Sequence, residues 1–185
     1  MSPAKFRALI TDISYVAKLE SEMLAMEMVD LEEVIRNIEW SLADKIKRSG
    51  GRLNLHLDVT QIRFSKKTLR SILFNLISNG IKFRGSDPPV IDITCTREKE
   101  NVVLSIQDNG IGISKENMHA IFNMYGRLNH AIEGQGIGLS LTKKIVDAAN
   151  GNIVVESEPG KGSKFIIYFK CEPEAFSVPA ADVSA

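Results

Sequence analysis

Three polar side chains on one face of an expected helix are the first residues of this chain that could do chemistry. Asn75, Asn79 and Lys82 are spaced at i, i+4 and i+7, so a helix over residues 66–83 would place them in one stripe. A neutral amide oxygen suits Mg²⁺ that is already surrounded by phosphate oxygens, and a lysine ammonium can act as a point charge on a phosphate. Asn-Gly is also a strong hairpin-turn motif, but the apolar stripe of this helix continues unbroken to its end, which a hairpin would interrupt.

An acidic residue that can only accept hydrogen bonds follows an expected strand. Asp108 begins the segment Asp-Asn-Gly-Ile-Gly-Ile, and its carboxylate would accept from the exocyclic amino group of adenine. Guanine carries a carbonyl oxygen at that position, so a buried carboxylate would reject it at a cost of roughly 1–3 kcal/mol. The Asp-Asn-Gly composition by itself favours a surface turn, and this alternative stays open.

Glycines are concentrated in the same part of the chain. Six of the thirteen glycines lie between Gly110 and Gly138, and backbone without side-chain cover can bring N–H groups against a nucleotide. The second segment, Gly-Gln-Gly-Ile-Gly-Leu over residues 134–139, opens an expected helix whose N-terminus could bind phosphate. Its spacing matches neither the dinucleotide-binding fingerprint nor the P-loop.

The elements that must position these residues alternate between helices and hairpins. Helices are expected over residues 31–47 with Asp30 as N-cap, 66–83 with Ser65 as N-cap, and 137–149; strands are expected over residues 53–57, 90–96, 102–107, 152–156 and 164–169. This order predicts an α+β fold, a two-layer sandwich with helices on one face of a mixed sheet. An apolar stripe from Phe6 to Ala17 predicts a further helix at the N-terminus.

Composition limits the classes of partner. Lys plus Arg equals Asp plus Glu at 23 each, so charge gives no case for nucleic acid or for contact with an anionic membrane. No apolar run approaches the ~20 residues of a membrane span. Cys95 and Cys171 lie far apart without metal-ligand spacing. Two reduced thiols favour a cytoplasmic location.

Four motifs occur in a fixed order, and together they are more specific than any one alone. They are Asn75-x-x-x-Asn79-x-x-Lys82, Asp108-x-Gly110-x-Gly112, Gly134-x-Gly136-x-Gly138 and Gly160-x-Gly162. This constellation resembles the GHKL ATPase superfamily and, within it, the catalytic ATP-binding domain of a bacterial sensor histidine kinase. FNLISNGIKF is similar to the N box, DNGIGI, GQGIGL and SEPGKGSKF to the glycine boxes, and IFNMYGRL to the F box of the ATP lid.

The resemblance implies a fold of the GHKL (Bergerat) type and a division of the chain. Residues 1–28 would be the end of the dimerisation and phosphoacceptor helical hairpin, residues 29–171 the ATP-binding catalytic domain, and residues 172–185 a disordered tail. Where this chain has Gly80, alanine is common in the family, and glycine weakens a helix by about 1 kcal/mol.

The resemblance also implies ATP and Mg²⁺ as bound groups. Asn79 would be the magnesium ligand, and Asn75 and Lys82 would act on the phosphates as the catalytic residues. Phe83 would lie near the adenine, Asp108 would accept from its amino group, and Ser163 would support this contact through water. The further residues of the nucleotide site and lid would be Gly110, Gly112, Ile113, Arg127, Gly134, Gly136, Ile137, Gly138 and Leu139.

The residue at position 75 distinguishes a kinase from a hydrolase. Hydrolysing members of the superfamily carry a glutamate there as general base, and the amide of Asn75 cannot take a proton from water. We therefore expect the chain to hold the γ-phosphate for another acceptor. An ATPase of the gyrase or mismatch-repair type is the weaker alternative, and a nucleotide-sensing module without phosphoryl transfer is another.

The expected phosphoacceptor is not evident in the chain. None of His56, His119 and His130 lies in a Ser-His-Glu-Leu-Arg-like context. We therefore expect the acceptor histidine on the helical hairpin of a full-length homodimeric kinase, with a response regulator downstream. A membrane anchor elsewhere in that full-length kinase stays open.

Overall fold

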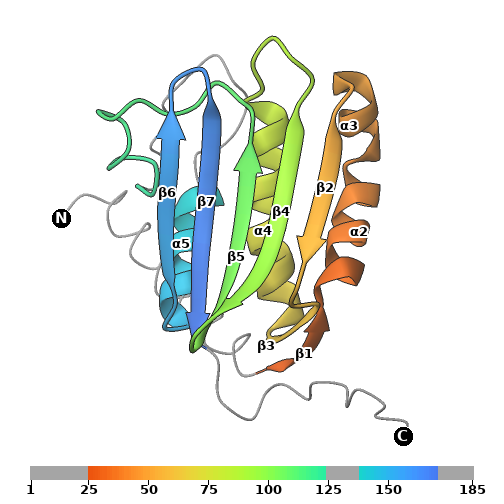
Figure 1. The fold of residues 1–185 in the computed structure, drawn as a ribbon, viewed down its shortest axis with the longest axis vertical. Helices are drawn as coiled ribbons and strands as arrows, with labels where there is room; N and C mark the ends of the chain where they lie inside the picture. Colours follow the sequence, from red (N-terminus) through yellow and green to blue (C-terminus); the bar gives the residue numbers. More distant parts are fainter. Residues whose placement is uncertain (1–24, 124–137, 171–185) are drawn as a thin grey trace, which may run out of the picture.

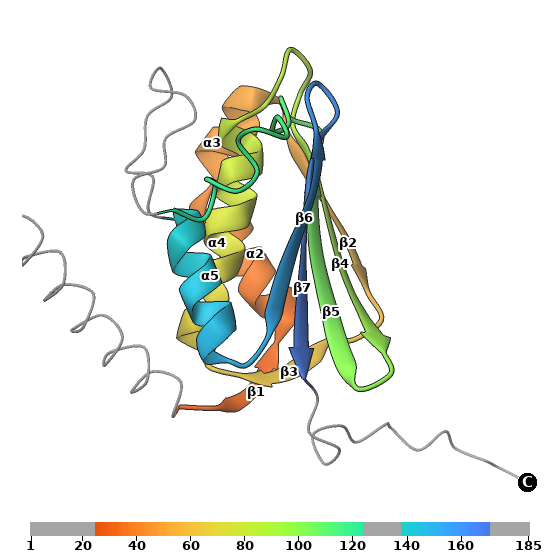
Figure 2. The same ribbon diagram turned by 90° about the vertical axis from the view of Figure 1, so that its left-hand side faces the viewer.

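The structure, a computed structural model, describes residues 25–123 and 138–170. They form two layers, a five-stranded sheet and a layer of helices packed on one of its faces (Figures 1 and 2). The predicted α+β sandwich with helices on one face of a mixed sheet is confirmed.

The sheet has the strand order β2-β4-β5-β7-β6. These strands are β2 (Arg52–Leu57), β4 (Val90–Glu98), β5 (Asn101–Asp108), β6 (Asn152–Glu158) and β7 (Gly162–Lys170). The β2–β4 pair is parallel, and the other three pairs are antiparallel. All five predicted strands are therefore present, each extended by one to a few residues.

Four helices form the second layer, and α4 lies in its middle. They are α2 (Leu31–Ser41), α3 (Ala43–Ser49), α4 (Lys66–Lys82) and α5 (Gly138–Ala148). Helix α4 contacts α2 and α5 and lies on β4 and β5, as Figure 2 shows. A residue on the sheet side of α4 can therefore reach the central strands.

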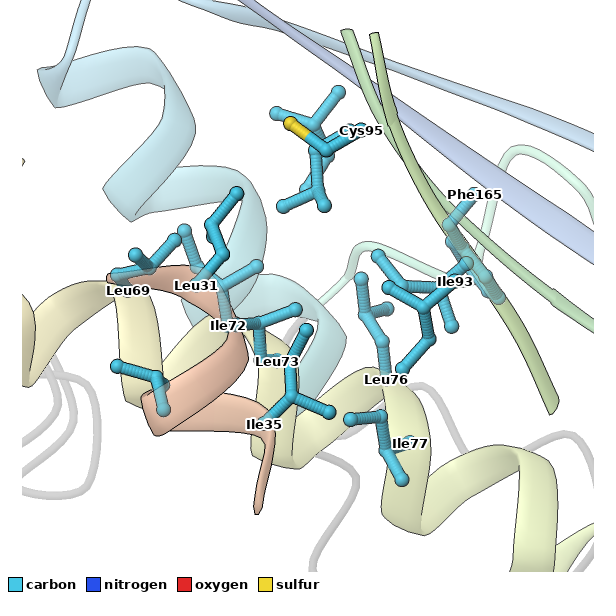
Figure 3. Packing of buried hydrophobic residues seen from close by; sticks show 14 of the residues in the cluster. Leu31, Ile35, Leu69, Ile72, Leu73, Leu76, Ile77, Ile93, Cys95 and Phe165 are labelled. Atoms are coloured by element: carbon cyan, nitrogen blue, oxygen red, sulfur yellow. The ribbon is translucent and has the colours of Figure 1, made fainter. Parts of the chain in front are cut away.

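The core lies between α4 and the inward side chains of the central strands. Helix α4 contributes the predicted apolar stripe, including Leu69, Ile72 and Leu76, which is buried against inward strand residues such as Ile93 (Figure 3). Successive side chains of a strand point to opposite faces of the sheet. A polar residue at the end of a strand therefore faces the helices only if it lies at an inward position.

One predicted helix is divided. Residues 31–47 were expected to form a single helix, but it ends at Ser41, and a second helix begins at Ala43. The Ser41 hydroxyl donates to the Asn37 carbonyl oxygen at 2.7 Å, and such back-bonding bends helices. The predicted N-cap is confirmed, since Asp30 Oδ1 accepts from the Glu33 N–H at 2.9 Å.

A small antiparallel sheet was not predicted. Strands β1 (Glu27–Asp30) and β3 (Gln61–Phe64) pair with each other at the start of α2 and α4. The ring of Phe64 packs against that of Phe169 with centroids 4.9 Å apart, which joins this sheet to β7. Four residues are too few to show a clear period, so sequence pattern alone did not identify either strand.

The predicted helix over Phe6 to Ala17 and the predicted tail over residues 172–185 lie outside the described residues. Within residues 25–123 and 138–170, none of the helices is both long enough and apolar enough to span a bilayer.

Glycine is required where the loop after β5 meets the β6–β7 hairpin. Gly112 has a φ of 69°, and a Cβ built there would collide with the Glu158 carbonyl oxygen. Gly160 has a similar φ of 79° but open space around its Cα, while Gly85 has neither feature. These three glycines therefore separate backbone strain from steric conflict.

We expect Gly112→Ala to lower the free energy of unfolding by about 3 kcal/mol or more, because it combines a strained φ with a backbone collision. Gly160→Ala should lower the free energy of unfolding by only about 1–2 kcal/mol, the cost of a left-handed conformation for alanine. Gly85→Ala should stay within about 0.5 kcal/mol of the parent. Urea unfolding measures all three. Equal losses at positions 112 and 160 would contradict the collision.

Candidate functional site

The predicted site residues gather at one end of the sheet, where β5 ends and β7 begins. Asp108 is the last residue of β5 and pairs in register with Ile91 on one side and Ser163 on the other. The C-terminal half of α4 lies over this end of the sheet. The helix that carries the polar stripe and the strand that carries the carboxylate therefore meet at this end of the sheet.

The carboxylate of Asp108 is partly buried and anchored by backbone. Its Oδ1 accepts from the Gly110 N–H at 2.8 Å and from the Ser163 N–H at 3.3 Å. The first bond closes an Asx turn. Asp-Asn-Gly is therefore a turn, as its composition indicated, and the Asp108 carboxylate accepts the hydrogen bond that closes it. Oδ2 makes no hydrogen bond to any residue that the structure describes.

The protein environment disfavours the charge on Asp108. Burial raises the pKa of its carboxyl above the ordinary value of 3.8, and hydrogen bonds from the Gly110 and Ser163 N–H groups only partly oppose this shift. A carboxylate kept in such a place at a cost in stability is a candidate for function.

The close approach of α4 to Asp108 is made at a glycine. A Cβ built on Gly80 would collide with the Ile91 Cδ1 and would lie 3.1 Å from the Cβ of Asp108. Gly80 is buried. It weakens the helix by about 1 kcal/mol relative to alanine, and its missing Cβ leaves room for this contact. Alanine at this position would require the end of the Ile91 side chain to shift.

The polar stripe of α4 is half-buried beside the apolar one. Asn75, Asn79 and Lys82 all lie on α4 and are partly covered, so the hairpin alternative for this segment is wrong. The Asn75 Nδ2 donates to the Gly138 carbonyl oxygen at 3.1 Å, which joins α4 to the first residue of α5. The side-chain amide of Asn79 makes no hydrogen bond within the described part of the chain. The Lys82 ammonium lies 4.7 Å from the centroid of the Phe83 ring.

The first glycine segment packs against protein backbone. The Ile111 N–H donates to the Phe83 carbonyl oxygen at 2.9 Å, and a Cβ on Gly110 would collide with that same oxygen. The glycines at 110 and 112 were expected to expose N–H groups to a ligand. In the structure they let this loop contact the end of α4 and the β6–β7 hairpin.

Two polar residues that the sequence did not single out organise this loop. Asn109 accepts from the Val90 N–H at 2.8 Å and donates to the Pro88 carbonyl oxygen at 3.1 Å. Ser157 accepts from the Ile113 N–H at 2.8 Å. The sequence clue to Ser157 was a polar residue at an inward position of a strand, two residues after Val155.

Four of the predicted residues lie outside the described part of the chain: Arg127, Gly134, Gly136 and Ile137. Leu139 and Ile113 are partly buried against the core. The described residues that the structure brings together are Asn75 with Gly138, Phe83 with Gly110, and Asp108 with Gly110 and Ser163.

Comparison with known proteins gives a consistent picture. The sequence model described as "Histidine kinase-, DNA gyrase B-, and HSP90-like ATPase" matches residues 64–173. Phytochrome-like protein Cph1 of Synechocystis sp. is 35% identical over 161 residues, which are 86% of this chain and 21% of that protein. Sensor protein RprX of Bacteroides fragilis is 34% identical over 151 residues, 78% of this chain and 29% of RprX.

The solved structures agree. The catalytic domain of the histidine kinase ThkA matches with a TM-score of 0.70 at 26% identity, over 80% of this chain and 97% of that one. The chain spans less than a third of the length of either curated relative.

The buried charge of Asp108 makes a prediction about stability. A raised folded-state pKa means that the ionised carboxylate destabilises the fold at pH 7, and that this penalty is relieved as the pH falls through the folded pKa toward 3.8. Asp108→Asn removes the charge and keeps an oxygen for both backbone N–H groups. We expect its free energy of unfolding at pH 7 to equal or exceed that of the parent, with the difference shrinking on acidification.

Urea unfolding between pH 4 and pH 8 measures this difference, and Asp58→Asn, at an exposed carboxylate, is the matched control. A clearly less stable Asp108→Asn protein at pH 7 would show that the carboxylate stabilises the fold rather than serving the site.

Proposed function

This chain belongs to the histidine kinase-, DNA gyrase B-, and HSP90-like ATPase family, and we propose that it binds Mg·ATP and donates the γ-phosphoryl group to a histidine outside this chain. It would thus be the catalytic domain of a sensor histidine kinase. The observation that carries the proposal is the junction of α4 with the end of β5, where the helix that carries Asn75, Asn79 and Lys82 approaches Asp108 at Gly80.

Asp108 is proposed to bind the adenine. Its Oδ1 is held by two backbone N–H groups, so the carboxylate cannot rotate freely and Oδ2 keeps its acceptor capacity. The exocyclic amino group of adenine is a donor that matches it. Phe83, one residue beyond α4, is proposed to contact the base, with Gly110, Gly112, Ile113 and Ser163 shaping the base end of the site.

The stripe on α4 is proposed to bind the phosphates. The half-buried Asn79 amide fits a magnesium ion shared with phosphate oxygens, because such an ion takes only one or two protein ligands. Mg²⁺ would supply neutralisation of the phosphate charge. Lys82 would add a second positive charge from one turn further along the helix.

Asn75 is proposed to favour transfer to another acceptor over hydrolysis. Its amide cannot act as a general base on water, and its Nδ2 is already engaged with the Gly138 carbonyl oxygen. That bond joins α4 to α5, whose first residues, Gly138 and Leu139, are the last two of the second glycine segment. Arg127, Gly134, Gly136 and Ile137 are proposed to belong to the nucleotide site and its lid.

The proposed partners follow from phosphoryl transfer to histidine. Residues 1–28 are proposed to end the helical hairpin that carries the acceptor, within a homodimeric kinase whose product passes phosphate to a response regulator. Residues 29–171 would be the catalytic domain, and residues 172–185 a tail. A cytoplasmic site of action is part of this proposal, because ATP and a response regulator would be available there.

The function is tested by mixing this chain with a separate protein that carries the cognate helical hairpin, in labelled ATP and Mg²⁺. We expect acid-labile phosphohistidine on the hairpin and none on this chain alone. Asp108→Asn is the matched inactive variant: it places an amide donor opposite the amino donor of adenine and should reduce transfer at least ~100-fold. Nucleotide binding without any phosphohistidine would instead support a nucleotide-sensing module.

Removal of the metal separates the role of Asn79 from that of the base. Calorimetry with ATP should show tighter binding in Mg²⁺ than in EDTA. We expect the ratio of ATP affinity in Mg²⁺ to that in EDTA to be about tenfold or more smaller in Asn79→Ala than in the parent, because one protein ligand is lost. The affinity of this variant in EDTA should stay near that of the parent. An unchanged gain would remove Asn79 from the metal site.

A further inference from the structure

Three polar side chains form a row across the inward face of the sheet. Ser157 of β6 pairs with Ser163 of β7, and Ser163 pairs with Asp108 of β5. The next inward row toward the middle of the sheet is apolar, with Val155, Phe165 and Ile106 in register. A polar row is therefore confined to the end of the sheet that carries the site.

The hydrogen bonds of Ser157 fix its single proton. Its Oγ lies 2.8 Å from the Gly162 carbonyl oxygen, and a carbonyl can only accept, so the Ser157 proton is donated there. The same Oγ accepts from the Ile113 N–H at 2.8 Å and contacts the Ser163 Oγ at 2.9 Å. Because a hydroxyl has one proton and two lone pairs, Ser163 must be the donor in this last bond.

The direction of the Ser163 proton decides what this hydroxyl can offer a ligand. With its proton directed to Ser157, the Ser163 Oγ can only accept. Its backbone N–H is directed to Asp108 Oδ1 at 3.3 Å. Asp108 and Ser163 are register partners in this row, and the Asp108 carboxylate and the Ser163 Oγ are therefore both acceptors.

This matters because a carboxylate by itself does not distinguish the purines fully. A 6-oxo purine presents an acceptor at position 6, but its N1–H is a donor from which the Asp108 carboxylate could accept a hydrogen bond. Such a base would fit if the neighbouring Ser163 hydroxyl could donate to the 6-oxo group. Adenine presents donors only from its amino group and needs no donor from Ser163 in that position.

We propose that Ser157 is a specificity-determining residue that, by holding the proton of Ser163, makes the site reject 6-oxo purine nucleotides in favour of adenine nucleotides. This rests on the proposed nucleotide site at Asp108. Ser157 is a positioning residue, because it acts on the base through Ser163.

The test compares the dissociation constants of ATP and inosine triphosphate, which differ at position 6 and N1 only. We expect the parent to prefer ATP by about 100-fold or more. Ser157→Ala frees the Ser163 proton and should lower this preference at least ~10-fold, through tighter binding of inosine triphosphate. Ser157→Thr retains a hydroxyl and should keep the parent preference.

The double variant Ser157→Ala, Ser163→Ala separates proton direction from loss of structure. It lacks the freed hydroxyl, so the preference for ATP should return. A merely structural role for Ser157 predicts that both nucleotides weaken by one common factor in Ser157→Ala, and this result would overturn the inference. Should Ser157→Ala fail to fold, Ser157→Cys fills similar space with a weak acceptor and should shift the preference in the same direction; an unchanged preference there would overturn the inference as well.

The two proposals fail differently. A parent protein that binds neither nucleotide overturns the nucleotide site itself. A parent that prefers ATP, with the preference unchanged in the Ser157 variants, leaves the site in place and overturns only the role of Ser157.

Discussion

The site depends on how closely α4 can approach the end of β5. The helix carries Asn75, Asn79 and Lys82, and the strand carries Asp108, so the two sets can serve one ligand only if helix and strand are in contact at this point. Gly80 lies at that contact, and a Cβ there would press on the end of the Ile91 side chain and on the Cβ of Asp108. The core below, with Leu69, Ile72 and Leu76 on the same helix, fixes how α4 lies over this end of the sheet.

Two features near Asp108 lower stability. Gly80 weakens α4 by about 1 kcal/mol relative to alanine, and Asp108 is held in a place where burial raises its pKa. The compensation is a set of backbone bonds to Asp108 Oδ1 from Gly110 and Ser163, and the contact of the Gly112 loop with Glu158. Destabilising groups that are firmly anchored are typical of sites where geometry matters more than stability.

The sequence predicted the parts of this arrangement that arise from local periodicity. The stripe of α4, the alternation of β4 and the apolar runs of β5 and β7 belong to elements of eight or more residues, and all were identified. The break at Leu42 and the short strands β1 and β3 were missed because a single back-bonded serine or a four-residue strand leaves almost no pattern. The site was predicted as a set of residues, but the reasons for Gly80, Gly110 and Ser157 lie in contacts with residues far apart in sequence, which spacing cannot show.

The acceptor oxygen Oδ2 of Asp108 also links the proposed adenine recognition to pH. Oδ1 of Asp108 receives two backbone N–H groups, so a proton added to the carboxyl would go to Oδ2. Protonation would turn the one oxygen that can accept from adenine into a donor. Because burial raises the pKa of this carboxyl, that change sets in at a higher pH than for an exposed aspartate. The environment that makes Asp108 costly to the fold would therefore also set the acidic limit of the proposed adenine recognition.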